Sequence, residues 1–303
     1  MSTLTQELAT VRDWLRYAVS EFTRARLCFG HGMASAYDEA AYLVLHTLHL
    51  PLDRLEPFLD ASTTTEERGR LLEVVSRRVE ERVPAAYLTR EAWLGEHRFY
   101  VDERVLIPRS YIAELLRDDL APWISDPERI QTALDLCTGS GCLAILLAHH
   151  FPNADVDAAD ISSDALAVAL RNVAEHNLQG RVNLIRSDLL SNLTEKRYDL
   201  IVSNPPYVTS MAMEELPQEY RHEPRVALAG GDDGLDAVRT ILSQAAEYLT
   251  PDGVLVVEVG HSRSAAEQAF PRLPFVWLAT DSSEDSVFLL KRGDLVAGKR
   301  AVA

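Results

Sequence analysis

The chain has 303 residues, 47% hydrophobic and 25% charged, which is typical of a globular protein long enough for two domains. No run of 18 apolar residues occurs, and residues 1–7 lack the basic start and apolar stretch of a signal peptide, so we expect neither a transmembrane helix nor secretion. The three cysteines, Cys28, Cys137 and Cys142, form no CxxC pair, which favours a reducing cytoplasm over a disulfide framework.

The net charge of −16 is unevenly distributed. Residues 1–110 carry 14 basic and 17 acidic side chains, whereas residues 111–303 carry 16 basic and 29 acidic ones. An acidic body repels nucleic-acid phosphates and attracts basic partners, so we expect a basic protein partner, no DNA and no membrane. Solubility alone is the alternative explanation of the charge. The sequence makes no prediction of an oligomeric state.

Residues 1–85 are predicted to form an N-terminal helical domain. Apolar residues recur at spacings of three and four between Leu8 and Phe22, as they do on one face of a helix. A second apolar helix is expected over 35–48. A third is expected to begin near Thr63-Thr-Thr-Glu and to end before Pro84.

Residues 86–110 are predicted to connect this domain to a domain over 111–303. Aromatic residues alternate in Ala92-Trp-Leu-Gly95 and His97-Arg-Phe-Tyr-Val-Asp102, which predicts a β-hairpin. Val105-Leu-Ile-Pro-Arg109 leaves the hairpin.

Strands and helices alternate from about residue 130. Strands are predicted at 131–137, 154–160, 182–187, 198–203, 253–259, 275–279 and 285–291, and helices at 142–150, 163–177, 234–249 and 262–270. Alternating strands and helices predict an α/β fold with a doubly wound, mostly parallel, Rossmann-like sheet. Ligands bind such a sheet at the carboxyl ends of its strands.

A glycine loop follows the first of these strands, in Leu134-Asp-Leu-Cys-Thr-Gly-Ser-Gly-Cys142. Gly139 and Gly141 allow a tight turn and a close approach to a ligand, and the N–H groups of the following helix favour an anionic group. The full GxGxxG is absent because Ala144 stands where its last glycine would be, and no Walker lysine follows.

Carboxylates follow the next two strands. Asp160 is placed to accept both hydroxyls of a ribose, and Asp188 to accept from an adenine amino group. Each acid alone could equally be a helix cap or a turn residue. Together with the glycine loop they predict a pocket for an adenosyl group with a carboxylate tail, which describes S-adenosylmethionine.

Asn204-Pro-Pro-Tyr207 follows the strand predicted at 198–203. Two prolines hold the chain extended and cannot donate backbone hydrogen bonds. The side-chain oxygen of Asn204 and the carbonyl of Pro205 can then accept from one planar NH2 group, with Tyr207 packed over it. The alternative is a strand terminator with a capping asparagine.

These motifs together resemble the class I S-adenosylmethionine-dependent methyltransferases, and more narrowly the protein-glutamine methyltransferases that modify release factors and ribosomal proteins. The match includes Tyr87-Leu-Thr, Phe99, Leu106-Ile-Pro-Arg109, the glycine loop, Asn204 to Tyr207 and Arg221-His-Glu-Pro224. The resemblance implies S-adenosylmethionine as methyl donor, bound by Asp135, Cys137, Thr138, Gly139, Gly141, Asp160, Ile161, Asp188, Leu189 and Asn204. It implies catalysis by Asn204, Pro205 and Tyr207, with Pro206 and Arg109 added as substrate-binding residues.

Within this family, the segments Phe29-Gly-His-Gly32, Leu48-His-Leu-Pro-Leu-Asp53 and Glu219-Tyr-Arg-His-Glu-Pro224 are most similar to the branch that modifies ribosomal protein L-three. The release-factor branch usually has proline and an acidic residue after the arginine, where this chain has Ser110-Tyr111. A release factor remains the alternative substrate, as does the amino group of a DNA or RNA adenine. A degenerate fold that only binds a ribosomal protein is a third alternative.

The remaining polar motifs are assigned smaller roles. No metal site is predicted, because His149-His150 and the His46/His49 pair lack an HExxH motif or a cysteine partner. Glu223-Pro224 and Gly230-Gly-Asp-Asp-Gly234 are expected to shape the loop over the acceptor. Arg109 is expected either at the rim of the active site or in an interdomain ion pair. The helical domain is expected to recognise the substrate.

Overall fold

The computed structural model describes residues 4–193 and 196–300, which form two compact units. The first unit runs through Ala92 and also includes Pro217–His222. Glu219 attaches this distant segment to its unit, because its carboxylate accepts from the backbone N–H of Cys28 at 3.0 Å and from Arg82 at 3.3 Å. The second unit consists of Trp93–Leu216 and Glu223–Ala303.

The first unit is helical, as predicted. Its helices are α1 (Leu4–Glu7), α2 (Val11–Arg24), α3 (Ala36–Thr47), α4 (Thr65–Glu80) and α5 (Ala85–Thr89), with a 3₁₀ turn η1 at Glu56–Phe58. The three long helices begin after the side-chain caps Thr10, Ser35 and Thr64, each of which accepts a backbone N–H of the first turn. The predicted helix over 8–22 therefore begins later, because Leu8 precedes the cap.

The second unit contains a seven-stranded sheet, which confirms the predicted fold class. Its strands are β3 (Thr132–Leu136), β4 (Asp155–Asp160), β5 (Val182–Arg186), β6 (Tyr198–Ser203), β7 (Leu249–Glu258), β8 (Val276–Leu278) and β9 (Val287–Lys291). The strand order is β5-β4-β3-β6-β7-β9-β8, parallel except for β9, which is antiparallel to both of its neighbours. β7 begins four residues earlier than predicted, because Leu249 pairs with Tyr198 across an irregularity in the ladder.

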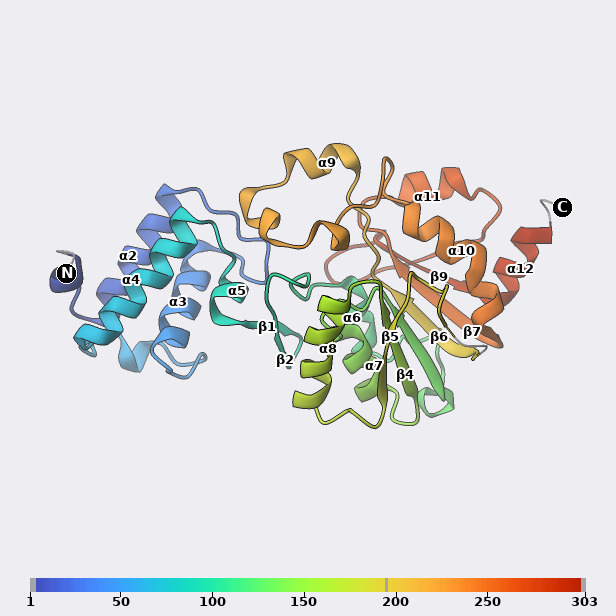
Figure 1. Ribbon diagram of the computed structural model, residues 1–303, viewed down its shortest axis with the longest axis horizontal. Coiled ribbons are helices and arrows are strands. Elements are labelled where there is room, and N and C mark those ends of the chain that lie inside the picture. The colour runs from blue at the N-terminus through green and yellow to red at the C-terminus, as the bar shows by residue number, and fades with distance from the viewer. Residues whose placement is uncertain (1–3, 194–195, 301–303) are drawn as a thin grey trace. The chain divides into compact units, whose positions relative to one another are not determined.

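Helices cover both faces of this sheet (Figure 1). One face packs against α6 (Tyr111–Leu116), α7 (Cys142–His150) and α8 (Ser163–Glu175), and the other against α10 (Asp236–Tyr248), α11 (Arg263–Ala269) and α12 (Arg292–Arg300). The sequence predicted all of these except α6 and α12. The signal of α12 is weak because it contains Gly293 and Gly298, yet Leu295 is buried against the sheet.

The predicted hairpin is β1 (Glu91–Leu94) and β2 (His97–Tyr100). In the second unit, Asn172 of α8 holds β2 by both backbone groups of Tyr100: its side chain accepts from the N–H at 2.7 Å and donates to the C=O at 3.0 Å. Shorter elements are η2 (Pro127–Arg129), α9 (Ser210–Glu215), η3 (Gln218–His222) and η4 (Arg225–Ala227). Among the described residues, no helix has both the length and the apolar character needed to cross a membrane.

Candidate active site

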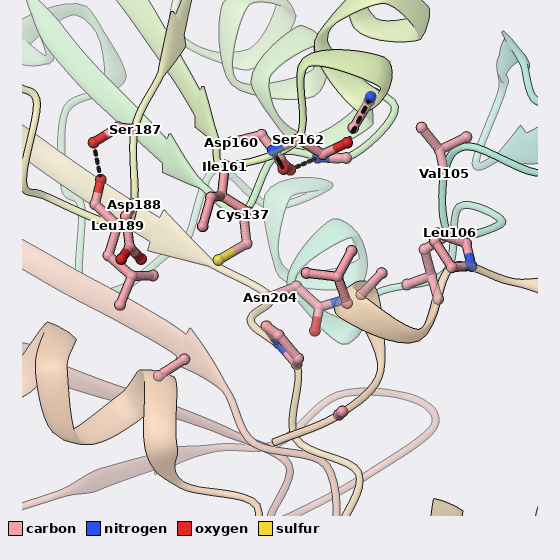
Figure 2. Close-up of a pocket in the computed structure, with 18 of the residues that line it drawn as sticks. Val105, Leu106, Cys137, Asp160, Ile161, Ser162, Ser187, Asp188, Leu189 and Asn204 are labelled. Atoms are coloured by element: carbon pink, nitrogen blue, oxygen red, sulfur yellow. Dashed lines mark hydrogen bonds between the residues drawn. The ribbon is translucent and has the colours of Figure 1, made fainter. Parts of the chain in front are cut away.

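A cavity of about 360 Å³ lies at the carboxyl ends of β3, β4 and β6 in the second unit. The chain leaves β3 for β4 on one side, while β6 pairs with β3 on the other, so the cavity lies where the strand order reverses. Figure 2 shows Asp160, Ile161, Asp188 and Asn204 around it. The predicted site residues that line it are Cys137, Gly139, Asp160, Ile161, Asp188, Leu189, Asn204 and Pro206.

The glycine loop and Asp160 are joined by a direct hydrogen bond. The carboxylate of Asp160 accepts from the N–H of Gly139 at 2.9 Å and from the N–H of Ser162 at 2.9 Å. Ser162, and not Asp160, is the residue whose side chain caps α8. Burial raises the pKa of Asp160, and the backbone donors oppose that shift by stabilising the charged form. The carboxylate is therefore fixed at the edge of the cavity.

Asp135, Thr138 and Gly141 lie behind this surface and do not line the cavity. Asp135 is 1% exposed, and its Oδ2 accepts from the hydroxyl of Thr138 at 2.6 Å and from the N–H of Ala144 at 3.0 Å. Burial raises the pKa of Asp135 to about 7. Gly141 has φ +82°, and an added Cβ would lie 3.1 Å from Cβ of Ala169. These three residues shape the loop from inside.

Asn204 is held by its amide nitrogen. Nδ2 donates to the backbone carbonyl of Arg109 at 3.2 Å, while Oδ1 has no hydrogen-bond donor within the described part of the chain. An amide fixed through its nitrogen presents its oxygen as an acceptor, and Asn204 lines the cavity (Figure 2). Pro205 is buried next to it, and Pro206 lines the wall.

Tyr207 is anchored away from the cavity lining. Its hydroxyl donates to Glu258 at the end of β7, with 3.0 Å between the oxygens. Burial and the neighbouring carboxylate of Glu258 raise the pKa of Tyr207, which keeps the phenol protonated. Glu258 is 1% exposed and also accepts from the hydroxyl of Ser110 at 2.7 Å and from the N–H of Tyr111 at 3.0 Å.

The segment from Leu228 to Gly234 braces the backbone after Tyr207. Val208 donates to the carbonyl of Leu228 at 2.8 Å and accepts from the N–H of Gly230 at 2.8 Å. Gly230 lies so close to the backbone of Tyr207 that an added Cβ would be 2.6 Å from Cα of Tyr207. The Gly230–Gly234 loop thus supports the Asn-Pro-Pro-Tyr segment from the side.

Arg109 donates to the Glu223 carboxylate from both terminal nitrogens of its guanidinium group, Nη1 at 2.6 Å and Nη2 at 2.7 Å. Glu223 also accepts from the N–H of Ile107 at 3.0 Å and is buried. Both residues belong to the second unit, so this ion pair lies within one fold although its residues are 114 positions apart. Arg109 does not line the cavity.

Sequence reasoning missed the role of Glu258 and the extent of the role of Glu223. The signal for Glu258 was its position at the carboxyl end of a predicted strand, the same signal that identified Asp160 and Asp188. Glu223 was noted only as part of a loop, because nothing local in the sequence shows that its carboxylate reaches Arg109 and Ile107.

The comparisons with known proteins agree with these motifs. Residues 119–220 match the methyltransferase small domain. The ribosomal protein uL3 glutamine methyltransferase of Bordetella pertussis is 60% identical over 290 residues, covering 96% of this chain and 97% of the relative. Proteins of the same name from Neisseria meningitidis serogroup A and Burkholderia pseudomallei are 58% and 56% identical, each aligned over at least 96% of both chains. The chain belongs to the family of the ribosomal protein uL3 glutamine methyltransferases.

Proposed function

We propose that this protein methylates the side-chain amide nitrogen of a glutamine in ribosomal protein uL3, in the cytoplasm, with S-adenosylmethionine as the methyl donor. The observation that carries the proposal is the fixed amide of Asn204, whose Nδ2 is engaged by Arg109 while the residue lines the cavity. The names of the relatives support the choice of substrate.

The residues around the cavity fit S-adenosylmethionine. A Cβ at Gly139 would meet nothing within 4 Å, so the loop leaves open space beside Asp160. Ile161, an apolar side chain 49% exposed, lines the cavity between two acids and offers a surface for a flat ring. Asp160 would accept from the ribose hydroxyls and Asp188 from the adenine amino group. When bound, the cofactor supplies an electrophilic methyl group.

The protein's own contribution is to orient the acceptor. An amide nitrogen is a poor nucleophile, because its lone pair is delocalised into the carbonyl. Oδ1 of Asn204 and the carbonyl of Pro205 would accept both N–H bonds of the glutamine amide, which fixes the nitrogen and stabilises the positive charge that develops on it. Tyr207, held by Glu258, would exclude water from one side.

The charge of the chain supports a basic protein as substrate. Residues 111–303 carry an excess of 13 acidic over basic side chains, and complementary charge accelerates the encounter of two proteins. An enzyme that extrudes a nucleic-acid base needs a basic groove, and the chain has only three lysines. We propose that the N-terminal helical domain, residues 1–85, recognises the protein substrate, with residues 86–110 as connector and 111–303 as the methyltransferase domain.

One experiment separates the substrates. The purified chain is incubated with methyl-labelled S-adenosylmethionine and, in parallel, with uL3, a release factor and duplex DNA. We expect label in uL3, at a glutamine located by mass spectrometry of its fragments. Label in the release factor instead would mean that the proposed reaction is correct but that its substrate is a release factor. Label in DNA would contradict both the proposed reaction and the proposed substrate.

A further inference from the structure

Three histidines from distant parts of the sequence meet on the surface of the second unit. They are His97 on β2, His149 on α7 and His176 at the end of α8. One ring nitrogen from each lies within 4.8 Å of those of the other two. His149 was weighed in the sequence only with its neighbour His150, which instead contacts Asp119 at 2.9 Å.

The rings are packed against one another. His97 and His149 stack with ring centres 4.7 Å apart and planes 9° apart, and both are within 5.8 Å of the ring centre of His176. The three rings therefore form one compact cluster in which each side chain has a ring nitrogen near those of the other two.

The third ring is oriented as metal-binding histidines are. Nε2 of His176 lies 2.9 Å from the backbone carbonyl of Arg98. A carbonyl only accepts, so Nε2 carries the proton and the lone pair is on Nδ1. A hydrogen bond from the second ring nitrogen to a backbone carbonyl is the common way in which a protein orients a histidine ligand.

We infer that His97, His149 and His176 form a binding site for a divalent transition-metal ion, with Zn²⁺ as the preferred occupant. Three imidazoles and a water match the coordination number of zinc, and imidazole suits this ion better than Mg²⁺ or Ca²⁺. Ligand nitrogens around a tetrahedral zinc are about 3.4 Å apart, and each coordinating lone pair lies in the plane of its ring. The stacked rings of His97 and His149 must therefore turn out of their parallel arrangement, and the nitrogens must move closer together, before both can bind one ion.

The ion would connect β2 to α7 and α8, two of the helices that pack on the sheet. β2 is already attached to α8 by Asn172, which also donates to the carbonyl of Ser140 in the glycine loop at 2.8 Å. Zinc at the histidine cluster would add a second attachment of the hairpin strand to α7 and α8. None of the three histidines lines the cavity, so the ion would be bound apart from the proposed site of methyl transfer.

The test uses the untagged full chain, freed of metal by a chelator and then titrated with Zn²⁺ in a calorimeter. We expect one ion per chain and a higher melting temperature with Zn²⁺, with no effect of Mg²⁺ at the same concentration. Co²⁺ added in place of Zn²⁺ should give the intense visible absorption of a four-coordinate ion.

Matched variants locate the site. His149→Gln changes an exposed side chain and should weaken Zn²⁺ binding at least about tenfold and abolish the rise in melting temperature. His150→Gln, one position along the chain, should bind as the wild type does. The inference is overturned if the wild type binds no more tightly than His149→Gln, or if His150→Gln loses binding to the same degree.

Discussion

Arg109 contacts both Glu223 and Asn204 and so connects these two residues. The carboxylate of Glu223 binds the Arg109 guanidinium at 2.6 Å and 2.7 Å, and the backbone carbonyl of the same arginine accepts from Nδ2 of Asn204 at 3.2 Å. Glu223 also accepts from the N–H of Ile107 at 3.0 Å. One buried carboxylate thus fixes the stretch of backbone that orients the proposed acceptor-binding amide.

Replacing Glu223 by Gln should therefore lower kcat without loosening the cofactor. The substitution keeps the volume but removes the charge that holds Arg109, and a misplaced catalytic amide costs rate steeply. We expect kcat to fall at least about tenfold, while S-adenosylhomocysteine binds within about twofold of wild type in a calorimeter. If kcat and the affinity for S-adenosylhomocysteine fell by the same factor, Glu223 would support the whole cavity and not Asn204 in particular. Glu284→Gln, the same substitution at an exposed glutamate outside the cavity lining, serves as the control.

Asn204→Ala removes the proposed acceptor of the glutamine N–H groups. Loss of one positioned hydrogen-bonding group in a transition state costs about 10²–10³ in rate, and loss of orientation adds to it. We expect methyl transfer to uL3 to fall below detection with cofactor affinity nearly unchanged. Transfer at the wild-type rate would refute the proposed role.

The pKa of Asp135 predicts a pH dependence of stability. Its folded-state pKa of about 7 lies above the value of an unfolded aspartate, so between about pH 4 and pH 7 the folded state binds more protons than the unfolded one. The free energy of unfolding must then fall as pH rises through this window, by up to about 1.4 kcal/mol per pH unit from this group.

Asp135→Asn should remove the part of the pH dependence of stability that comes from Asp135. The amide oxygen can still accept from Thr138 and Ala144, which bind the carboxylate at 2.6 Å and 3.0 Å. Urea unfolding of both proteins at pH 5, 6, 7 and 8 measures the difference. We expect the variant to gain stability relative to wild type as pH rises, and a constant difference across the series would show that Asp135 does not titrate in this range.

Much of the fold followed from patterns local in sequence. The alternation of strands and helices, the glycine loop and the acids after the strands are local patterns. They predicted the mostly parallel sheet and a ligand pocket near Asp160, Asp188 and Asn204, but not the order of the strands. Sequence reasoning placed Asp135 among the cofactor ligands, because it could not tell a carboxylate facing the cavity from one turned inward to the loop backbone.

The contacts that escaped prediction are those made by residues far apart in the chain. Arg109 and Glu223 are separated by 114 positions, and Tyr207 and Glu258 by 51. Their pairing depends on how loops return across the sheet, which periodicity does not encode. The histidine cluster escaped for the same reason: His97, His149 and His176 share no motif.

Gly230 provides a test of the loop that supports the Asn-Pro-Pro-Tyr segment. A Cβ there would lie 2.6 Å from Cα of Tyr207 and 2.8 Å from the carbonyl oxygen of Pro206, both backbone atoms that cannot rotate away. Gly230→Ala should push this backbone out of position and cost about 1–3 kcal/mol of stability.

The matched control is Gly180→Ala, where an added Cβ would meet nothing within 4 Å. It should leave the melting temperature and kcat unchanged, whereas Gly230→Ala should lower both. Because the strain falls beside Pro206 and Tyr207, kcat should drop even at temperatures where the variant remains folded by circular dichroism. If the folded variant kept the wild-type kcat, the position of the backbone at Tyr207 would not affect methyl transfer. The Gly230–Gly234 loop would then contribute to stability alone.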